Sequence, residues 1–66
     1  MTPNKRFVRS AWPNAEVHYV GDGIWQAQSV GGDKRLQVLG RGSTIGGAWA
    51  SAAAALRTTI EVAKNG

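Results

Sequence analysis

The chain has few side chains that could take part in acid–base or nucleophilic chemistry. It contains one histidine, no cysteine and four carboxylates, which are Glu16, Asp22, Asp33 and Glu61. Nucleophilic catalysis by a serine needs a histidine beside it and an acid that orients the histidine. No serine has a spacing to His18 that favours such a set. Asp22 and Asp33 stand among glycines, where aspartate is typical of turns. The sequence therefore predicts no catalytic residues and a protein that is not an enzyme.

Glu16 and His18 are two residues apart, which places both side chains on one face of a strand. A histidine beside a carboxylate can form an ion pair that responds to pH. The alternative is that His18 is simply solvated at the surface. One histidine and four scattered acids do not make a metal ligand set, and cysteine is absent. We therefore expect no metal and no cofactor.

The segment GRGSTIGGAWASAAAAL (40–56) places four glycines before an alanine-rich stretch. The N-terminus of a helix attracts anions. A phosphate-binding loop, however, needs Gly-Lys-Ser/Thr, and this segment has no lysine. A dinucleotide fingerprint needs a parallel βαβ unit, which so short a chain with a meander does not supply. The segment therefore predicts a turn from strand to helix.

These residues are positioned by elements that we predict in the order helix, three strands, helix. Thr2 and Pro3 are typical of a helix start, and Trp12-Pro13 ends that helix. Segments 15–20, 24–30 and 35–39 are separated by Gly/Asp turns, which indicates an antiparallel meander. Ser43 or Thr44 caps a long helix that runs to about residue 63 and has an apolar stripe reaching Ile60. We expect one α+β domain over residues 1–66, with an αβββα fold and both helices on one sheet face.

Alternation along the strands divides the predicted sheet into two faces. The face expected to pack beneath the helices carries Val17, Tyr19, Trp25, Ala27, Leu36 and Val38. The opposite, exposed face carries Glu16, His18, Gln26, Gln28 and Gln37, with Val20, Ile24, Val30 and Leu39 toward the strand ends. Trp25 and Trp49 are therefore expected in the core. Trp12, at the corner between helix and strand, either covers the core or protrudes as an interface anchor.

Eight Lys or Arg against four Asp or Glu give a net charge of +4. This balance favours polyanionic partners, although it also keeps a small protein soluble. A chain of this size buries only about 60% of the surface that its unfolded form exposes, so its stability margin is small. No apolar run approaches the length of a membrane span, and the N-terminus lacks the apolar core of a signal peptide. We expect a cytoplasmic protein without a membrane partner.

The order of elements resembles the double-stranded-RNA-binding domain, and the motif that carries the resemblance comprises Gly40, Gly42, Thr44, Ala48, Ala52 and Ala53. That family closes its last strand with Gly-x-Gly-x-Ser/Thr and continues with lysines and paired alanines. The lysines that it places on phosphates correspond here to Ile45, Gly46 and Trp49. Its Gly-Pro-x-His hairpin is replaced by residues 21–23, Gly-Asp-Gly. The resemblance therefore implies the skeleton of the family without its RNA-contacting residues.

The segments AWPNAEV, GIWQAQS and LGRGST, followed by AWASAAAAL, resemble small uncharacterised proteins of bacteriophages and prophages. Such proteins often act by stoichiometric binding to a host or defence protein, for example a CRISPR effector, or by binding nucleic acid. The resemblance implies a role of this kind in the bacterial cytoplasm, although origin alone does not confer a function.

Two functions remain open from the sequence. A protein interface, with a host protein or a second copy, would use Trp12, His18, Gln26, Gln28 and Gln37. Nucleic-acid contact through phosphates would use Lys5, Arg6, Arg9, Lys34, Arg35 and Arg41. We favour the protein partner, because the cations are dispersed and the lysines of the RNA-binding family are missing. No small-molecule substrate is expected.

Overall fold

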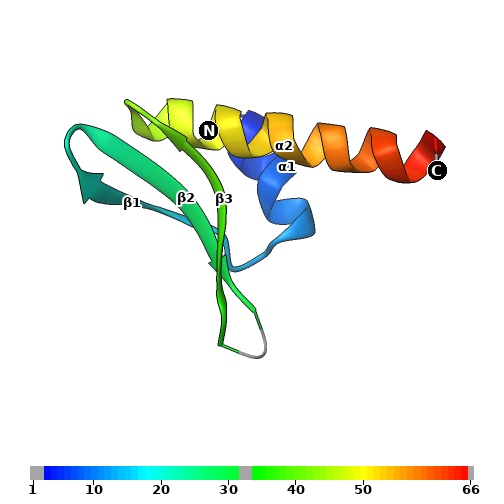
Figure 1. Ribbon diagram of the computed structural model, residues 1–66, viewed down its shortest axis with the longest axis horizontal. Coiled ribbons are helices and arrows are strands. Elements are labelled where there is room, and N and C mark those ends of the chain that lie inside the picture. The colour runs from blue at the N-terminus through cyan, green and yellow to red at the C-terminus, as the bar shows by residue number, and fades with distance from the viewer. Residues whose placement is uncertain (1–2, 32–33, 66) are drawn as a thin grey trace.

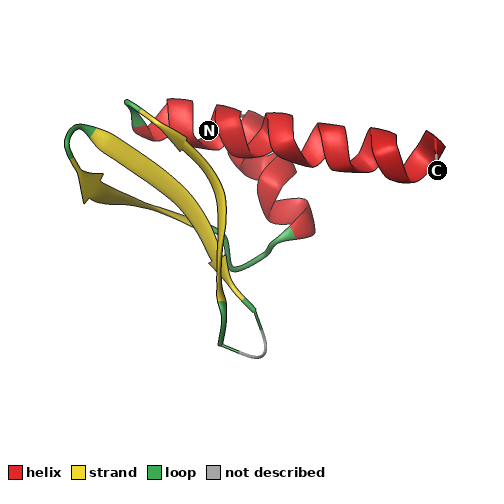
Figure 2. Ribbon diagram, viewed as in Figure 1, coloured by secondary structure: helices red, strands yellow, loops and turns green. Residues whose placement is uncertain are grey.

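The computed structural model of the chain describes residues 3–31 and 34–65. It contains α1 (Pro3–Ala11), β1 (Glu16–Gly21), β2 (Ile24–Val30), β3 (Leu36–Gly42) and α2 (Ile45–Asn65). The strands form one antiparallel sheet in the order β1-β2-β3 (Figures 1 and 2). The predicted αβββα fold is confirmed. The predicted cap Thr2 and the turn residue Asp33 lie outside the described residues.

The boundaries of the elements follow local backbone chemistry. α1 begins at Pro3 and ends before Trp12-Pro13, where the Ala15 amide donates to the Trp12 carbonyl at 2.9 Å and reverses the chain. At the start of α2 the Gly47 amide donates to Thr44 Oγ1 at 2.9 Å. The sequence suggested Ser43 or Thr44 as the cap of α2, and the structure shows that it is Thr44.

Both helices lie on one side of the sheet, with α2 across it and α1 beside α2 (Figure 1). The buried cluster between these layers consists of Val8, Ala15, Ala27, Leu39, Ala48, Trp49, Ala52 and Ala53. Phe7, Trp12, Val17 and Trp25 pack against this cluster and are partly buried. The predicted core position of Trp49 is thus confirmed, and Trp25 packs against the core while remaining partly buried. Trp12 covers the core, which is one of the two roles that the sequence left open.

A β-bulge at Leu39 changes which side chains of β3 are buried. Ala27 pairs with Gly40 and Gln28 pairs with Val38, so Leu39 is the extra residue. One extra residue exchanges the two faces for the rest of a strand. Leu39 is only 7% exposed, whereas Leu36 and Val38 are 55% and 47% exposed. The predictions that Leu36 and Val38 face the core and that Leu39 faces outward were wrong for this reason.

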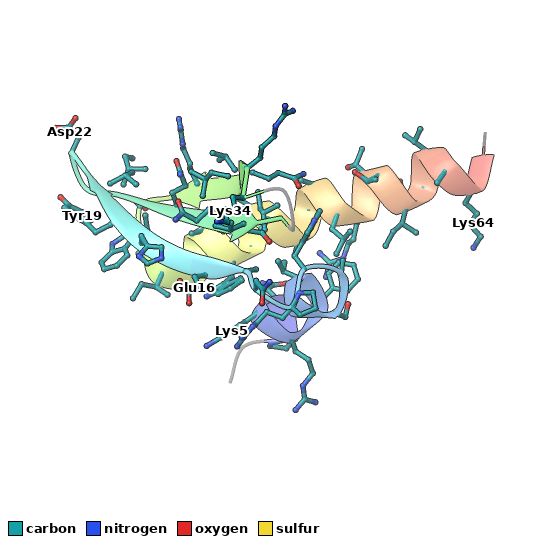
Figure 3. The ribbon with its side chains drawn as sticks, turned by 90° about the horizontal axis from the view of Figure 1, so that it is seen from below. Lys5, Glu16, Tyr19, Asp22, Lys34 and Lys64 are labelled. Carbon is teal, nitrogen blue, oxygen red and sulfur yellow. The ribbon has the colours of Figure 1, made fainter. Side chains whose placement is uncertain are left out.

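Tyr19 was also predicted in the core, and it is more than half exposed. It lies near the tip of the first hairpin, close to Asp22 (Figure 3). Its ring meets Trp25 edge-on, with the ring centroids 5.3 Å apart, and its hydroxyl accepts a hydrogen bond from the Gly23 amide at 2.9 Å. Tyr19 therefore stabilises the hairpin turn. It is exposed because this turn lies outside the region where the helices cover the sheet.

The C-terminal part of α2 extends past the sheet and past α1 (Figure 1). Within residues 45–64 of α2, Leu56 is the last that is buried, and residues 57–64 are exposed. Ile60, which the sequence placed on the packing stripe, is about half exposed because no other element reaches it. None of the helices in the described part of the chain combines the length and apolarity that a membrane crossing requires.

Candidate interaction surfaces

The face of the sheet opposite the helices is covered by no other element of residues 3–31 and 34–65 (Figure 1). We call it the outer sheet face. By strand register it comprises Glu16, His18, Ile24, Gln26, Gln28, Val30, Leu36, Val38 and Arg41. Antiparallel sheets commonly leave one face to solvent, and that face is then mostly polar. This one carries both polar and aliphatic side chains.

A hydrogen-bonded row, which we call the amide row, lies on the outer sheet face and consists of Gln26, Gln28 and Arg41. By register, Gln26 of β2 stands between His18 of β1 and Arg41 of β3. Arg41 Nε donates to Gln26 Oε1 at 2.9 Å, and Gln26 Nε2 donates to Gln28 Oε1 at 3.0 Å. Gln26 is only 7% exposed although no layer covers it. Its neighbours on the adjoining strands therefore shield it and hold its amide in one orientation.

His18 and Glu16 occupy the β1 side of the same face. His18 Nε2 lies 3.0 Å from Glu16 Oε2, and both side chains are more than half exposed to solvent. The pairing that their spacing suggested is therefore present. Because both groups are solvated, the pair adds little to folding stability. Its effect on the surface is to place an acid and a base beside the amide row.

Aliphatic side chains adjoin the amide row toward the second hairpin. Val30 pairs with Leu36, and Val38 pairs with Gln28. All three aliphatic residues are about half exposed. By register they lie toward the ends of β2 and β3 that meet at the second hairpin. That end of the hairpin extends away from the helices (Figure 2). An exposed aliphatic group beside fixed hydrogen-bonding groups has the composition of a protein interface, in which an apolar centre adjoins polar residues.

The residues predicted for a protein interface are divided by the fold. His18, Gln26 and Gln28 come together on the outer sheet face. Gln37 pairs with Ser29 and so belongs by register to the helix side, because the bulge at Leu39 reverses its face. Trp12 lies at the end of α1 against the core, apart from the sheet face.

The sequence reasoning missed two aliphatic members of this surface, Leu36 and Val38, and placed Arg41 only among the nucleic-acid contacts. The alternation of side chains along the strand gave no sign of the first error, since alternation is the pattern of an unbulged strand. The pair Gly40 and Gly42 was the available hint, because glycine in a strand often marks a bulge or a close backbone approach.

The predicted nucleic-acid residues occupy three places. Lys5, Arg6 and Arg9 lie on α1, Lys34 and Arg35 lie at the second hairpin, and Arg41 lies on the outer sheet face. Lys34 and Arg41 stand at opposite ends of β3, on the order of 20 Å apart at the rise of an extended strand. Figure 3 shows Lys5 on α1 and Lys34 beside the sheet, on different parts of the molecule. The fold therefore concentrates only the α1 cations.

The fold and this surface define a class, a small αβββα domain with one open and partly aliphatic sheet face. Searches found no matching protein-family model, curated protein or solved structure. Within residues 3–31 and 34–65, no group of three or more His, Asp or Glu residues gathers as a metal site.

Proposed function

We propose that this protein is a small non-catalytic binding module that acts by stoichiometric binding of a protein partner through the outer sheet face. The observation that supports it best is the group Val30, Leu36 and Val38, exposed beside the hydrogen-bonded row of Gln26, Gln28 and Arg41. An antiparallel sheet face that meets only solvent is mostly polar, whereas this face carries three neighbouring aliphatic side chains. Burial of such a group is the main favourable term in protein association.

The fixed amide row adds specificity to this surface. Side chains that are ordered before binding lose less conformational entropy when a partner docks. Gln26 is already held by Arg41 and Gln28, so this row is partly preorganised. The partner that we propose is a host or defence protein of a bacterial cell, in keeping with the resemblance to phage proteins. A second copy of the chain is the other protein that this surface could bind.

Affinity capture from bacterial extract tests this function, with the full chain as bait and with or without nuclease. We expect a retained protein that survives nuclease treatment and is lost with Val38→Glu. Val62→Glu is the matched control, because Val62 is an exposed valine on the part of α2 that extends past the sheet. Sedimentation of the same variants detects a second copy as the partner. Retention that is equal for both variants would contradict the proposal.

The alternative is a nucleic-acid-binding domain with contacts mainly to phosphates. The observation in its favour is the hollow on α1 that Lys5, Arg6 and Arg9 line together with Ser10 and Pro13. Such binding would depend steeply on salt and little on nucleic-acid sequence. In the capture experiment it would appear as material that nuclease releases and that Val38→Glu leaves unchanged.

A further inference from the structure

A groove of about 400 Å³ runs beside β1, and its lining identifies it as an edge groove. Its walls include the consecutive residues 15–18, together with Lys5 and Arg9 of α1 and Ile45 and Trp49 of α2. Consecutive residues of a strand point to opposite faces of a sheet. A hollow that touches all of 15–18 therefore lies along the edge of the strand, between that edge and the two helices.

β1 is an edge strand, because among the described residues it pairs with β2 alone. One side of its backbone thus presents N–H and C=O groups that no strand covers, and such an edge is a template for another strand. Its pairing with β2 is regular from Glu16 to Tyr19 and becomes irregular only after Tyr19. The other edge strand, β3, is interrupted in its middle by the bulge at Leu39. The regular, open edge is therefore the one beside the groove.

The side chains of the groove combine positive charge with an apolar wall. Lys5 Nζ lies 5.8 Å from the centre of the Trp49 ring, and Arg9 Nη2 donates to the Pro13 carbonyl at 3.2 Å. Neither cation makes an ion pair within the described residues, and Figure 3 shows Lys5 on the side of the molecule where Glu16 lies. Ile45 is about half exposed. A ligand that satisfies these groups carries both a carboxylate and an aliphatic side chain.

We propose that this groove binds an extended acidic segment of a partner protein, which adds to the sheet as a strand along the free edge of β1. Main-chain hydrogen bonds to β1 supply part of the affinity in this mode, and pockets for alternate side chains supply specificity. Side chains two residues apart on the added strand face the helices together. One of them is an acid that meets Lys5 and Arg9, and another is an aliphatic residue that meets Ile45.

Other ligands fit this groove less well. A small molecule is usually enclosed by its pocket, whereas one wall of this groove is an exposed strand edge. A nucleic-acid backbone would meet the apolar Ile45, and it could not form main-chain hydrogen bonds with the strand edge. The groove shares Glu16 and His18 with the outer sheet face but touches neither the aliphatic group Val30, Leu36 and Val38 nor the pair Gln26 and Gln28. Either proposal can therefore fail while the other stands.

A random octapeptide library displayed on phage, selected against the full chain at low salt, tests this site. We expect enriched peptides to carry Asp or Glu two positions from Val, Ile or Leu. In ¹⁵N–¹H spectra a synthetic enriched peptide should shift the amides of residues 15–19, Lys5, Arg9 and Ile45. No enrichment, enrichment of basic peptides, or shifts confined to other residues would overturn the inference.

Charge variants of the protein and N-methylated peptides together separate strand addition from simple charge attraction. Lys5→Glu combined with Arg9→Glu should lower the affinity for the peptide about tenfold or more. The control that replaces Lys64, an exposed lysine at the far end of α2, by Glu should not weaken it (Figure 3). N-methylation of one set of alternate peptide amides should abolish binding, and methylation of the other set should leave it. If both sets bind equally, or if duplex RNA or DNA displaces the peptide and shifts the same amides, the site does not add a strand.

Discussion

At the scale of single residues, two glycines of β3 allow the backbones of sheet and helix to touch. A Cβ built on Gly40 would lie 2.4 Å from the Ala52 amide nitrogen, and one on Gly42 would lie 2.5 Å from the Gly47 carbonyl carbon. Real Cβ atoms do not approach backbone atoms this closely. Close backbone contact therefore replaces the large side chains that usually fill the space between a sheet and a helix.

Gly40→Ala should destabilise the fold for this reason. The added methyl group meets the backbone of α2, which cannot turn aside as a flexible side chain would, so the whole helix must shift. Overpacking of this kind costs about 1–3 kcal/mol. Chemical unfolding in urea measures the loss. Gly46→Ala is the matched control, since a Cβ at Gly46 would meet no atom within 4 Å.

The control should leave the free energy of unfolding unchanged or raise it by up to about 1 kcal/mol, because alanine is the better helix former. If Gly40→Ala and Gly46→Ala had the same effect, the close packing of β3 on α2 would be refuted.

At the scale of elements, the bulge in β3 decides what the second hairpin presents. It turns Leu39 into the core and leaves Leu36 and Val38 on the outer sheet face. The same shift moves Gln37 of β3 to the helix side. The amide row therefore consists of Gln26 and Gln28 of β2 with Arg41 of β3. One inserted residue thus creates the aliphatic part of the proposed interface. Bulges often redirect side chains next to functional sites.

Leu39→Ala and Leu36→Ala test the bulge directly. Removing the buried Leu39 side chain should lower the free energy of unfolding by about 2–4 kcal/mol, because it leaves a cavity beside α2. Removing the exposed Leu36 side chain should change it by no more than about 0.5 kcal/mol. Thermal or urea unfolding gives both values. An unbulged strand, in which Leu36 faces the core, would reverse the order of the two effects.

At the scale of the whole molecule, the protein has a small buried core, and two segments extend beyond it into solvent. The buried cluster is rich in alanine, and Val8 is its largest fully buried side chain. The second hairpin and the end of α2 both extend away from the region where the helices cover the sheet (Figure 1). A small domain with so little buried apolar volume has a low stability margin. Docking of a partner on the outer sheet face would add to it by mass action.

Hydrogen exchange should divide α2 into two parts. The amides of residues 48–55 are hydrogen-bonded within the part of α2 that packs against β3, and they should exchange only on near-global unfolding. The amides of residues 60–65 belong to a helical end with no packing partner in the described structure, and isolated helical turns are marginal in water. They should exchange orders of magnitude faster. Uniform protection along α2 would show that this end is covered by another copy or by another part of the chain.

The elements of this fold were predictable because local chemistry specifies them. Pro3 and Trp12-Pro13 bound α1, the Gly-Asp-Gly turn at 21–23 requires left-handed backbone at Asp22 and Gly23, and Thr44 caps α2. In the candidate surface, the positions of His18, Gln26 and Gln28 were also predictable. Side chains alternate between the two sheet faces without interruption along β2 and along residues 16–19 of β1.

What the amino-acid sequence determined by itself was therefore the order of elements and their ends, because these depend on the preferences of a few adjacent residues. The tertiary structure alone decided the faces of β3 and the depth of Tyr19. Whether a strand bulges depends on how Gly40 and Gly42 fit against a helix that follows later in the chain. That fit is a contact between two backbones that are distant in sequence. The alternation of side chains along one strand cannot predict such a contact.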